Sequence, residues 1–262
     1  MTLSIAVTSG KGGVGKTNTA VNLAISLGQS GRNVLLFDAD FGLANVHVLL
    51  GTKPSKSVAD FLDGTCTMEE SITRFSDNLS ILSGGSGLTE LLNLDNKRRH
   101  QILSGISNLS RNIDYLIVDC PAGAAESTLF FTSASDISLV VLVEEPTSFL
   151  DAYALIKAAN LEARVKNFAV AVNMAETNSM AKNSFEKFRE IAIRFLDVNL
   201  HYAGMIPYSK EIKHAVTQRN PVTLSQPNSV PSACFKEMAK TLITVPIHSS
   251  KSLKFFDNGG RK

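Results

Sequence analysis

An eight-residue segment near the amino terminus constrains the fold more than any other part of the chain. Residues 10–17 read Gly-Lys-Gly-Gly-Val-Gly-Lys-Thr, and they stand between an apolar-alternating run and a helical run. The pattern G-x-x-x-x-G-K-[ST] between a strand and a helix is that of a phosphate-binding loop. Its glycines allow successive N–H groups to surround phosphate oxygens, and the following helix adds its N-terminal dipole. We therefore expect a nucleoside triphosphate site here.

Side chains and backbone groups of this loop have distinct expected roles. Lys16 is expected to reach the β- and γ-phosphates, and the Thr17 hydroxyl is expected to ligate Mg²⁺. Lys11 is a second lysine of the loop, for which the ordinary interpretation is a solvated side chain. The other residues that we expect to contact the nucleotide are Gly10, Gly12, Gly13, Val14, Gly15 and Asn18.

Length, charge and cysteine content narrow the class of protein. The 262 residues and an apolar fraction of 44% suit one large α/β domain, which we place at residues 1–246, followed by a tail at 247–262. Lys and Arg number 26 against 24 Asp and Glu, so the overall charge does not favour a direct nucleic-acid partner. The three cysteines lack paired spacing, which argues against disulfides and zinc. No apolar run approaches the roughly 18 residues of a membrane span, and an expected strand begins almost at Met1, so we expect a soluble cytoplasmic protein.

Two further apolar runs end in acidic residues. Residues 33–38 end in Asp38, with Asp40 two positions on, and residues 114–119 end in Asp119. Such continuous runs are typical of parallel strands that are covered on both faces, and open α/β sheets bind ligands at the carboxyl ends of their strands. We expect Asp40 to position or deprotonate the attacking water. Asp38 would lie nearer Mg²⁺ or its water shell, and Asp119 would also hold that water shell. The alternative for Asp38 and Asp40 is that they are only an N-cap and a loop acid.

The rest of the chain alternates between strand-like and helix-like segments. Strands are expected at 3–9, 78–82, 137–143, 166–172 and 200–206, and helices at 16–30, 42–51, 57–64, 95–111, 179–196, 210–218 and 232–242. In helix 179–196 we expect four core side chains, Phe185, Phe188, Ile191 and Phe195. The basic cluster 97–100 is expected to be a solvated helix face, with a docking patch as the alternative. Cys120 lacks an adjacent activating base, so we expect a small buried residue and not a nucleophile.

Lys11 gives the loop a specific likeness. With this second lysine, the loop resembles the deviant phosphate-binding loop of the MinD/ParA class of ATPases. Residues 38–51, Asp-Ala-Asp-Phe-Gly-Leu-Ala-Asn-Val-His-Val-Leu-Leu-Gly, are similar to a segment of the FlhG/FleN family of flagellar number regulators, which usually has an acid where His47 stands. Residues 145–157, which begin Glu-Pro-Thr-Ser and end Asp-Ala-Tyr-Ala-Leu-Ile-Lys, resemble a second segment of that family.

This resemblance implies a fold and further site residues. The fold is one doubly wound, mostly parallel α/β sheet with helices on both faces. Residues 119–123, Asp-Cys-Pro-Ala-Gly, are similar to the switch II segment, in which the N–H of Gly123 approaches the γ-phosphate. Asn173 and Pro207 correspond to residues that contact adenine. In the family Lys11 reaches the phosphates of the other subunit, and its candidate partners are Glu145 in the dimer and Asp151 in the resting monomer.

The resemblance also implies an activity and partners. It implies ATP/ADP and Mg²⁺ as cofactors, a homodimer in the ATP state, and slow ATP hydrolysis that controls flagellar number and placement. The implied partners are an FlhF-type GTPase or a flagellar transcription activator. One alternative is a nucleotide-gated binding module that antagonises such an activator with hydrolysis secondary, and another is a MinD-type ATPase for placing the division site. For the tail, the resemblance implies a short amphipathic helix with weak, reversible contact to the inner membrane face or cell pole, against a disordered tail.

Overall fold

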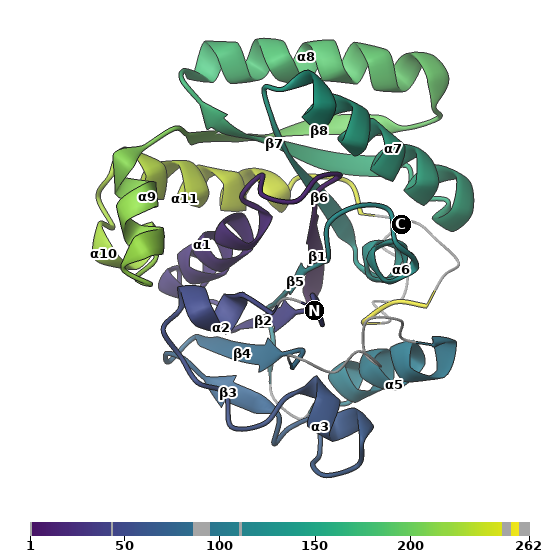
Figure 1. The fold of residues 1–262 in the computed structure, drawn as a ribbon, viewed down its shortest axis with the longest axis vertical. Helices are drawn as coiled ribbons and strands as arrows, with labels where there is room; N and C mark the ends of the chain where they lie inside the picture. The colour runs from purple at the N-terminus through teal and green to yellow at the C-terminus, as the bar shows by residue number, and fades with distance from the viewer. Residues whose placement is uncertain (1, 43, 86–94, 110–111, 248–252, 257–262) are drawn as a thin grey trace.

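An eight-stranded sheet runs through the computed structural model, which describes residues 2–42, 44–85, 95–109, 112–247 and 253–256 (Figure 1). Its strands are β1 (Leu3–Thr8), β2 (Val34–Asp38), β3 (Ile72–Arg74), β4 (Leu79–Ser83), β5 (Tyr115–Asp119), β6 (Ile137–Val143), β7 (Asn167–Ala175) and β8 (Asn199–Pro207). Their order is β3-β4-β2-β5-β1-β6-β7-β8, and every neighbouring pair is parallel except β3 and β4. The expected doubly wound, mostly parallel α/β sheet is therefore confirmed.

Helices cover both faces of this sheet (Figure 1). They are α1 (Lys16–Gln29), α2 (Val46–Leu49), α3 (Val58–Leu62), α5 (Asn96–Ser107), α6 (Glu126–Ala134), α7 (Pro146–Ala163), α8 (Asn178–Phe195), α9 (Lys210–Thr217), α10 (Val222–Ser225) and α11 (Val230–Leu242). Apolar side chains of α1 and α11 form one buried layer with one face of the sheet. On the other face, α5 and α6 pack over β2 and β5, and α7 and α8 pack over β6 and β7. Burial on both faces explains why all seven residues of β6 are buried.

Helix α8 corrects one expectation about the core. Phe185 and Phe188 are buried, but Ile191 is 50% exposed and Phe195 is 67% exposed. The buried side chains of α8 recur at alternating steps of four and three residues, which keeps them on one face of a helix. Ile191 falls outside that stripe. Phe195 has the spacing of the stripe, but it is the last residue of α8 and its side chain stays largely exposed.

The basic cluster 97–100 is only partly a solvated face. Arg99 is buried, and its guanidinium donates to the Glu126 carboxylate at the start of α6 over 2.9 Å. The same guanidinium lies 5.9 Å from the centre of the Phe130 ring. One member of the expected solvated cluster therefore connects α5 to α6. Neither α6 nor the three-residue antiparallel strand β3 was among the expected elements.

The described part of the tail, residues 253–256, lies against α6. The Phe255 side chain is fully buried and stacks on Phe131, with ring centroids 6.1 Å apart. The Lys254 ammonium donates over 2.7 and 3.1 Å to two backbone carbonyls near the end of α6, those of Ser135 and Ser133. Burial lowers the pKa of Lys254 to about 8. These four residues are not helical, and the rest of the expected tail helix lies outside the described residues. No helix in the described part of the chain is long and apolar enough to cross a bilayer.

Candidate nucleotide-binding site

The loop 10–17 connects β1 to α1 (Figure 1). It lies at the point of the sheet where the strand order reverses, with β5 on one side of β1 and β6 on the other. Gly15 is the N-cap of α1 and has φ of 88°, in the left-handed region that favours glycine. At Gly10 the reason for glycine is space, because an added Cβ would lie 2.1 Å from the backbone carbonyl carbon of Asp151 in α7. The loop is thus held directly against α7, with the N-terminus of α1 behind it, as an anion site requires.

A buried ion pair forms the centre of the site. Lys16 Nζ lies 2.8 Å from Asp119 Oδ1, and both side chains are buried. The pairing follows from the sheet, because Asp119 ends β5 and is the register partner of Val7 in β1 and of Asp38 in β2. Burial lowers the pKa of Lys16, but the Asp119 carboxylate outweighs burial, so the net pKa is raised. Lys16 therefore stays protonated, as binding to phosphate oxygens requires.

Asp38 is a second buried carboxylate at the same edge of the sheet. It accepts hydrogen bonds from the backbone N–H groups of Val46 at 3.0 Å and Asp40 at 3.3 Å. Burial, with the neighbouring Asp119 carboxylate as the second cause, raises the pKa of Asp38 to about 7. Asp40 itself is half-buried, and its charge acts on Lys16 and Asp119. The three expected acids therefore lie together around Lys16.

The raised pKa of Asp38 makes a prediction about stability. A carboxyl group with a raised pKa in the folded state favours folding while it is protonated, and this contribution is lost as pH rises through the folded pKa. We compare the free energy of unfolding of the nucleotide-free wild type with that of Asp38→Asn. As pH rises from 5 to 8, the wild type should lose on the order of 2 kcal/mol relative to the variant. The amide oxygen of asparagine can still accept from Val46. Denaturant unfolding at several pH values measures the difference.

A control for this prediction comes from Asp60, whose pKa is lowered, first by the hydrogen bond from the Ser57 hydroxyl. Its stabilisation is present above the unfolded pKa and is lost as pH falls through the folded pKa. Asp60→Asn should therefore destabilise the protein by an amount that does not change between pH 5 and 8. A constant difference between wild type and Asp38→Asn over the same range would contradict the prediction.

The donor set suits a magnesium ion that keeps most of its water. Asp119 Oδ2 is buried and has no hydrogen-bond partner, and such an orphaned carboxylate oxygen calls for a cation or an ordered water. The Thr17 hydroxyl lies 3.5 Å from Lys16 Nζ, and it lowers the pKa of the same carboxyl group. Within the described ranges no three His, Cys, Asp or Glu residues form a metal cluster. Mg²⁺ is usually bound by one or two protein groups together with phosphates and water, so Thr17, Asp38 and Asp119 fit it.

The second loop lysine, Lys11, contacts α7 and not the Asp119 carboxylate that Lys16 contacts. Its ammonium lies 3.2 Å from Glu145 Oε2 and 3.3 Å from the Thr147 hydroxyl, at the start of α7, and its side chain is 42% exposed. The resemblance assigned Glu145 to the dimer and Asp151 to the monomer, whereas the ion pair present in the single chain is with Glu145. Pro146 at the first position of α7 starts the helix earlier than its apolar pattern suggests, which places Glu145 beside the loop.

Asn173 is held by the loop itself. Its amide Nδ2 donates to the carbonyl of Val14 at 2.7 Å, and its Oδ1 accepts from the N–H of Met174 at 2.8 Å. A Cβ on Gly15 would lie 2.2 Å from the same Nδ2, so glycine is needed here for this contact as well. The amide keeps one free N–H and one lone pair for a base. Pro207 ends β8, next to β7, which ends just beyond Asn173.

The segment after β5 contacts the residue that precedes the loop. The N–H of Gly123, which has φ of 83°, donates to the carbonyl of Ser9 at 2.8 Å. Ser9 also donates its hydroxyl to the carbonyl of Lys11 at 2.9 Å. Ser9 and Thr147 were not among the expected site residues; the available signals were the position of Ser9 directly before the loop and of Thr147 in the first turn of α7. Burial raises the pKa of the Cys120 thiol, which agrees with a structural role.

Comparison with known proteins places this geometry in a family. The ParA family model, described as NUBPL iron-transfer P-loop NTPase, matches residues 1–243. The chain belongs to the ParA family of P-loop NTPases. It is 40% identical over 254 residues to the antiactivator FleN of Pseudomonas aeruginosa, with 96% of this chain and 91% of that protein covered. It is 33% identical to the flagellum site-determining protein YlxH of Helicobacter pylori, over 92% of this chain and 81% of that one.

Solved structures of the ParA family have the same architecture. The cell division ATPase MinD of Pyrococcus furiosus superimposes with a TM-score of 0.75 at 25% identity, covering 93% of this chain and 99% of that one. MinD of Pyrococcus horikoshii, determined as a complex with Mg-ADP, superimposes with a TM-score of 0.73 at 24% identity, covering 92% and 95%. The expected likeness to the MinD/ParA class and to flagellar regulators is confirmed.

Proposed function

We propose that the protein is an ATP-dependent dimerisation switch that hydrolyses ATP slowly and regulates flagellar number and placement. The observation that carries the proposal is the divergence of the two loop lysines. Lys16 is buried on Asp119, inside the phosphate cradle, whereas Lys11 reaches the surface beside Glu145. A loop lysine that does not serve its own cradle is available to a second subunit. The site is then complete only when two chains meet at this face.

Each residue of the site has a role in this proposal. The loop 10–17 cradles the phosphates, with the N–H groups of its glycines and of Val14, and Lys16 exchanges Asp119 for phosphate oxygens. Asn173 and Pro207 hold the base. Bound through Thr17, Asp38 and Asp119, Mg²⁺ would neutralise phosphate charge. Asp40 orients water for attack on the γ-phosphate, and Gly123 transmits the state of that phosphate to α6.

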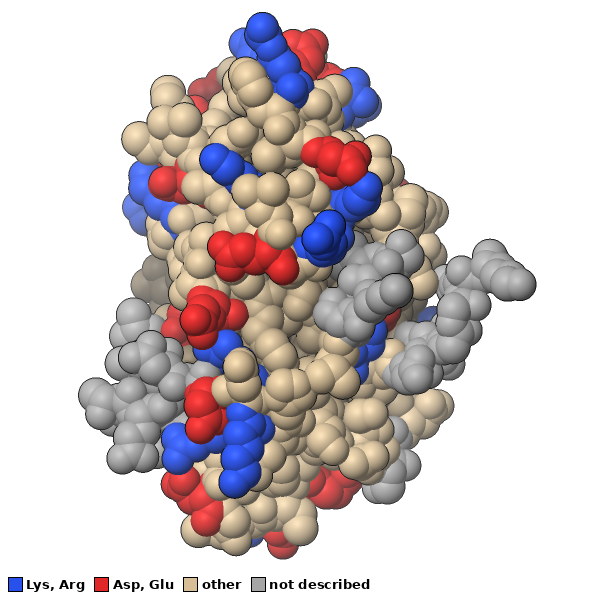
Figure 2. Space-filling model, turned by 90° about the vertical axis from the view of Figure 1, so that its right-hand side faces the viewer, with Lys and Arg blue, Asp and Glu red and all other residues tan. Residues whose placement is uncertain are grey.

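The proposed output is a change of partner. The relatives named antiactivator FleN and flagellum site-determining protein YlxH support a flagellar role, through a flagellar transcription activator or an FlhF-type GTPase. On the face shown in Figure 2, Lys and Arg are interspersed with Asp and Glu, a distribution that offers no single-sign surface to nucleic acid. We place the protein in the cytoplasm. Reversible contact with the membrane or pole requires Phe255 to leave α6.

Asp40→Ala tests the dimer. Without hydrolysis, the ATP state should persist, so size-exclusion chromatography with light scattering should give the mass of one chain with ADP and of two chains with ATP. Wild type with a non-hydrolysable analogue is the matched control and should also be dimeric. A single-chain mass under all three nucleotide conditions would overturn the switch.

The same variant distinguishes the proposal from a second candidate. The name antiactivator favours a binding module that antagonises a transcription activator with hydrolysis secondary. If cells that carry Asp40→Ala lose hydrolysis but keep a normal number of flagella, the binding module is the better description. If flagellar number changes while the protein still dimerises with ATP, hydrolysis is part of the output.

A further inference from the structure

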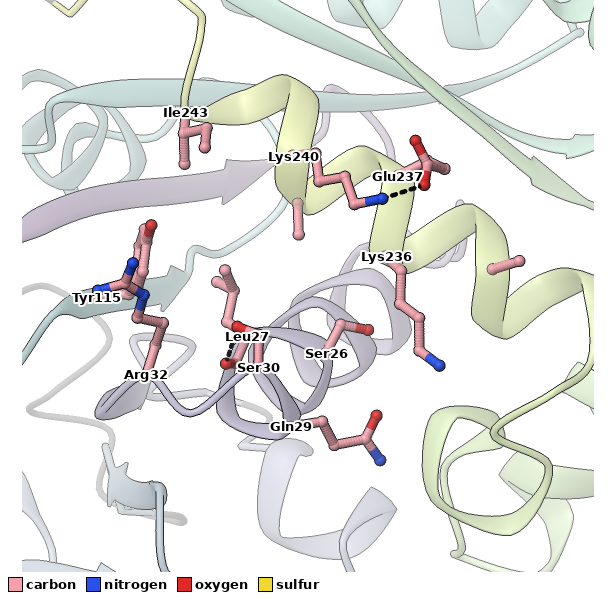
Figure 3. A pocket seen from close by; sticks show the side chains of 12 residues that line it. Ser26, Leu27, Gln29, Ser30, Arg32, Tyr115, Lys236, Glu237, Lys240 and Ile243 are labelled. Atoms are coloured by element: carbon pink, nitrogen blue, oxygen red, sulfur yellow. Dashed lines mark hydrogen bonds and ion pairs between the residues drawn. The ribbon is translucent and has the colours of Figure 1, made fainter.

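A groove at the end of the sheet opposite the nucleotide loop is not used by the proposed function. It has a volume of about 540 Å³ and lies between the C-terminal end of α1 and one side of α11 (Figure 3). Arg32, just before β2, and Tyr115, the first residue of β5, mark this as the amino-terminal edge of the parallel strands. We propose that the groove is a docking surface for an amphipathic helix that carries acidic side chains, from a protein partner.

Charge is the first argument for this occupant. Three cations line the groove, Arg32, Lys236 and Lys240, against a single acid, Glu237, which is bound to Lys240 at 2.6 Å. Arg32 is exposed and has no ion-pair partner among the residues that the structure describes. Lys236 donates to the carbonyl of Pro227, at 3.0 Å. The groove therefore carries a local excess of two positive charges, which equals the formal net charge of the whole chain.

The groove also has an apolar side. Leu27 and Ala239 are buried at its base, and Ile243 at the end of α11 is 52% exposed. An apolar base between cationic rims matches a helix with one apolar face and acidic flanks. Nucleic acid fits less well, because its backbone would meet this apolar surface and the Glu237 carboxylate.

The dimensions set the length of the partner. The lining residues of α11 extend from Ala233 to Ile243, which at 1.5 Å per residue is roughly 15 Å, or about three turns of a docked helix. In Figure 3, Lys236 extends from α11 on the side of Gln29, where its ammonium donates to the carbonyl of Pro227, while Lys240 turns toward Glu237. Acidic side chains one helical turn apart on the partner could then reach Lys236 and Lys240 in succession.

The test uses the full chain and a synthetic probe. The probe is a fluorescein-labelled peptide of about 18 residues, long enough to form helix, with leucines on one face and glutamates beside them. We expect saturable binding by fluorescence anisotropy, weakened by salt. Arg32→Glu with Lys236→Glu should weaken binding roughly tenfold or more, because both replacements place like charges against the peptide. Arg32→Gln with Lys236→Gln removes the same charges without added repulsion. Its affinity for the peptide should lie between those of wild type and the Glu variant.

Controls separate the groove from general electrostatics. Lys97→Glu with Lys187→Glu changes the net charge equally on two exposed lysines of α5 and α8 and should leave binding unchanged. A peptide with lysine in place of glutamate should not bind. Equal loss in the two reversal variants would overturn the proposal, as would no binding to wild type. It would also be overturned if the groove variants lost affinity only for duplex DNA or for vesicles containing phosphatidylserine.

Discussion

Replacing Lys16 by alanine is expected to abolish ATP binding and, at pH 8, to lower the unfolding midpoint of the nucleotide-free protein by roughly 10 °C. Removing one partner of a buried ion pair leaves the other charge uncompensated, which costs about 3–5 kcal/mol. Here the remaining charges are Asp119 and the nearby Asp38, both buried at the same sheet edge. Scanning calorimetry measures the unfolding midpoint, and titration with nucleotide measures ATP binding.

The size of this loss should depend on pH. Burial raises the pKa values of Asp119 and Asp38, so near pH 6 these carboxyl groups can take up protons when Lys16 is absent. The destabilisation should therefore be smaller at pH 6 than at pH 8. Lys16→Met would show the same trend while keeping most of the apolar stem.

A double variant separates stability from binding. Lys16→Ala with Asp119→Asn removes both charges, so its loss of stability should be smaller than the sum of the two single losses by more than about 1 kcal/mol. ATP binding should stay absent, because the phosphate ligand is still missing. If the losses were additive, the pair observed at 2.8 Å would contribute no coupling, and the explanation given for the Lys16 effect would be wrong.

The sequence predicted the centre of the site because its residues are fixed by short local rules. A phosphate-binding loop requires its glycines, Lys16 and Thr17 at set spacings, and buried parallel strands that end in Asp38 and Asp119 must bring these acids to one edge. Strand order then decided which acid meets Lys16. The register of β5 beside β1 places Asp119 next to Lys16. The hydrophobic periodicity of the sequence does not indicate which strands are neighbours.

Other features depended on contacts between distant segments, which a single sequence does not reveal. Arg99 stands in a run of basic residues, yet its partner Glu126 is 27 positions away, in a helix that was not expected. Phe255 looked like part of a membrane-binding helix, but Phe131 provides a buried site for it. In each case the charged or amphipathic pattern alone suggested an exposed segment, and packing against α6 buries one of its side chains instead.

Lys11 offers the sharpest test of the dimer, because two interpretations of its contact with Glu145 make different predictions. If Lys11 serves mainly the intrachain pair, Lys11→Ala and Glu145→Gln should change the stability of the chain and the affinity of the dimer equally and only slightly. Both side chains are about half exposed, and such pairs contribute about 0–1 kcal/mol. If Lys11 instead reaches the phosphates of the other subunit, the weak pair is readily given up when the dimer forms.

We expect the second outcome. Lys11→Ala should leave ADP binding by the single chain unchanged, because the ammonium lies outside its own cradle. It should weaken the ATP dimer roughly a hundredfold, since losing one partner of a buried charge pair at an interface costs about 2–5 kcal/mol. Glu145→Gln should dimerise as wild type does or slightly better, because it frees Lys11. Lys53→Ala, another exposed lysine, is the matched control. Sedimentation with the non-hydrolysable analogue distinguishes the cases, and equal dimer affinities in Lys11→Ala and Glu145→Gln would show that Lys11 does not cross the interface.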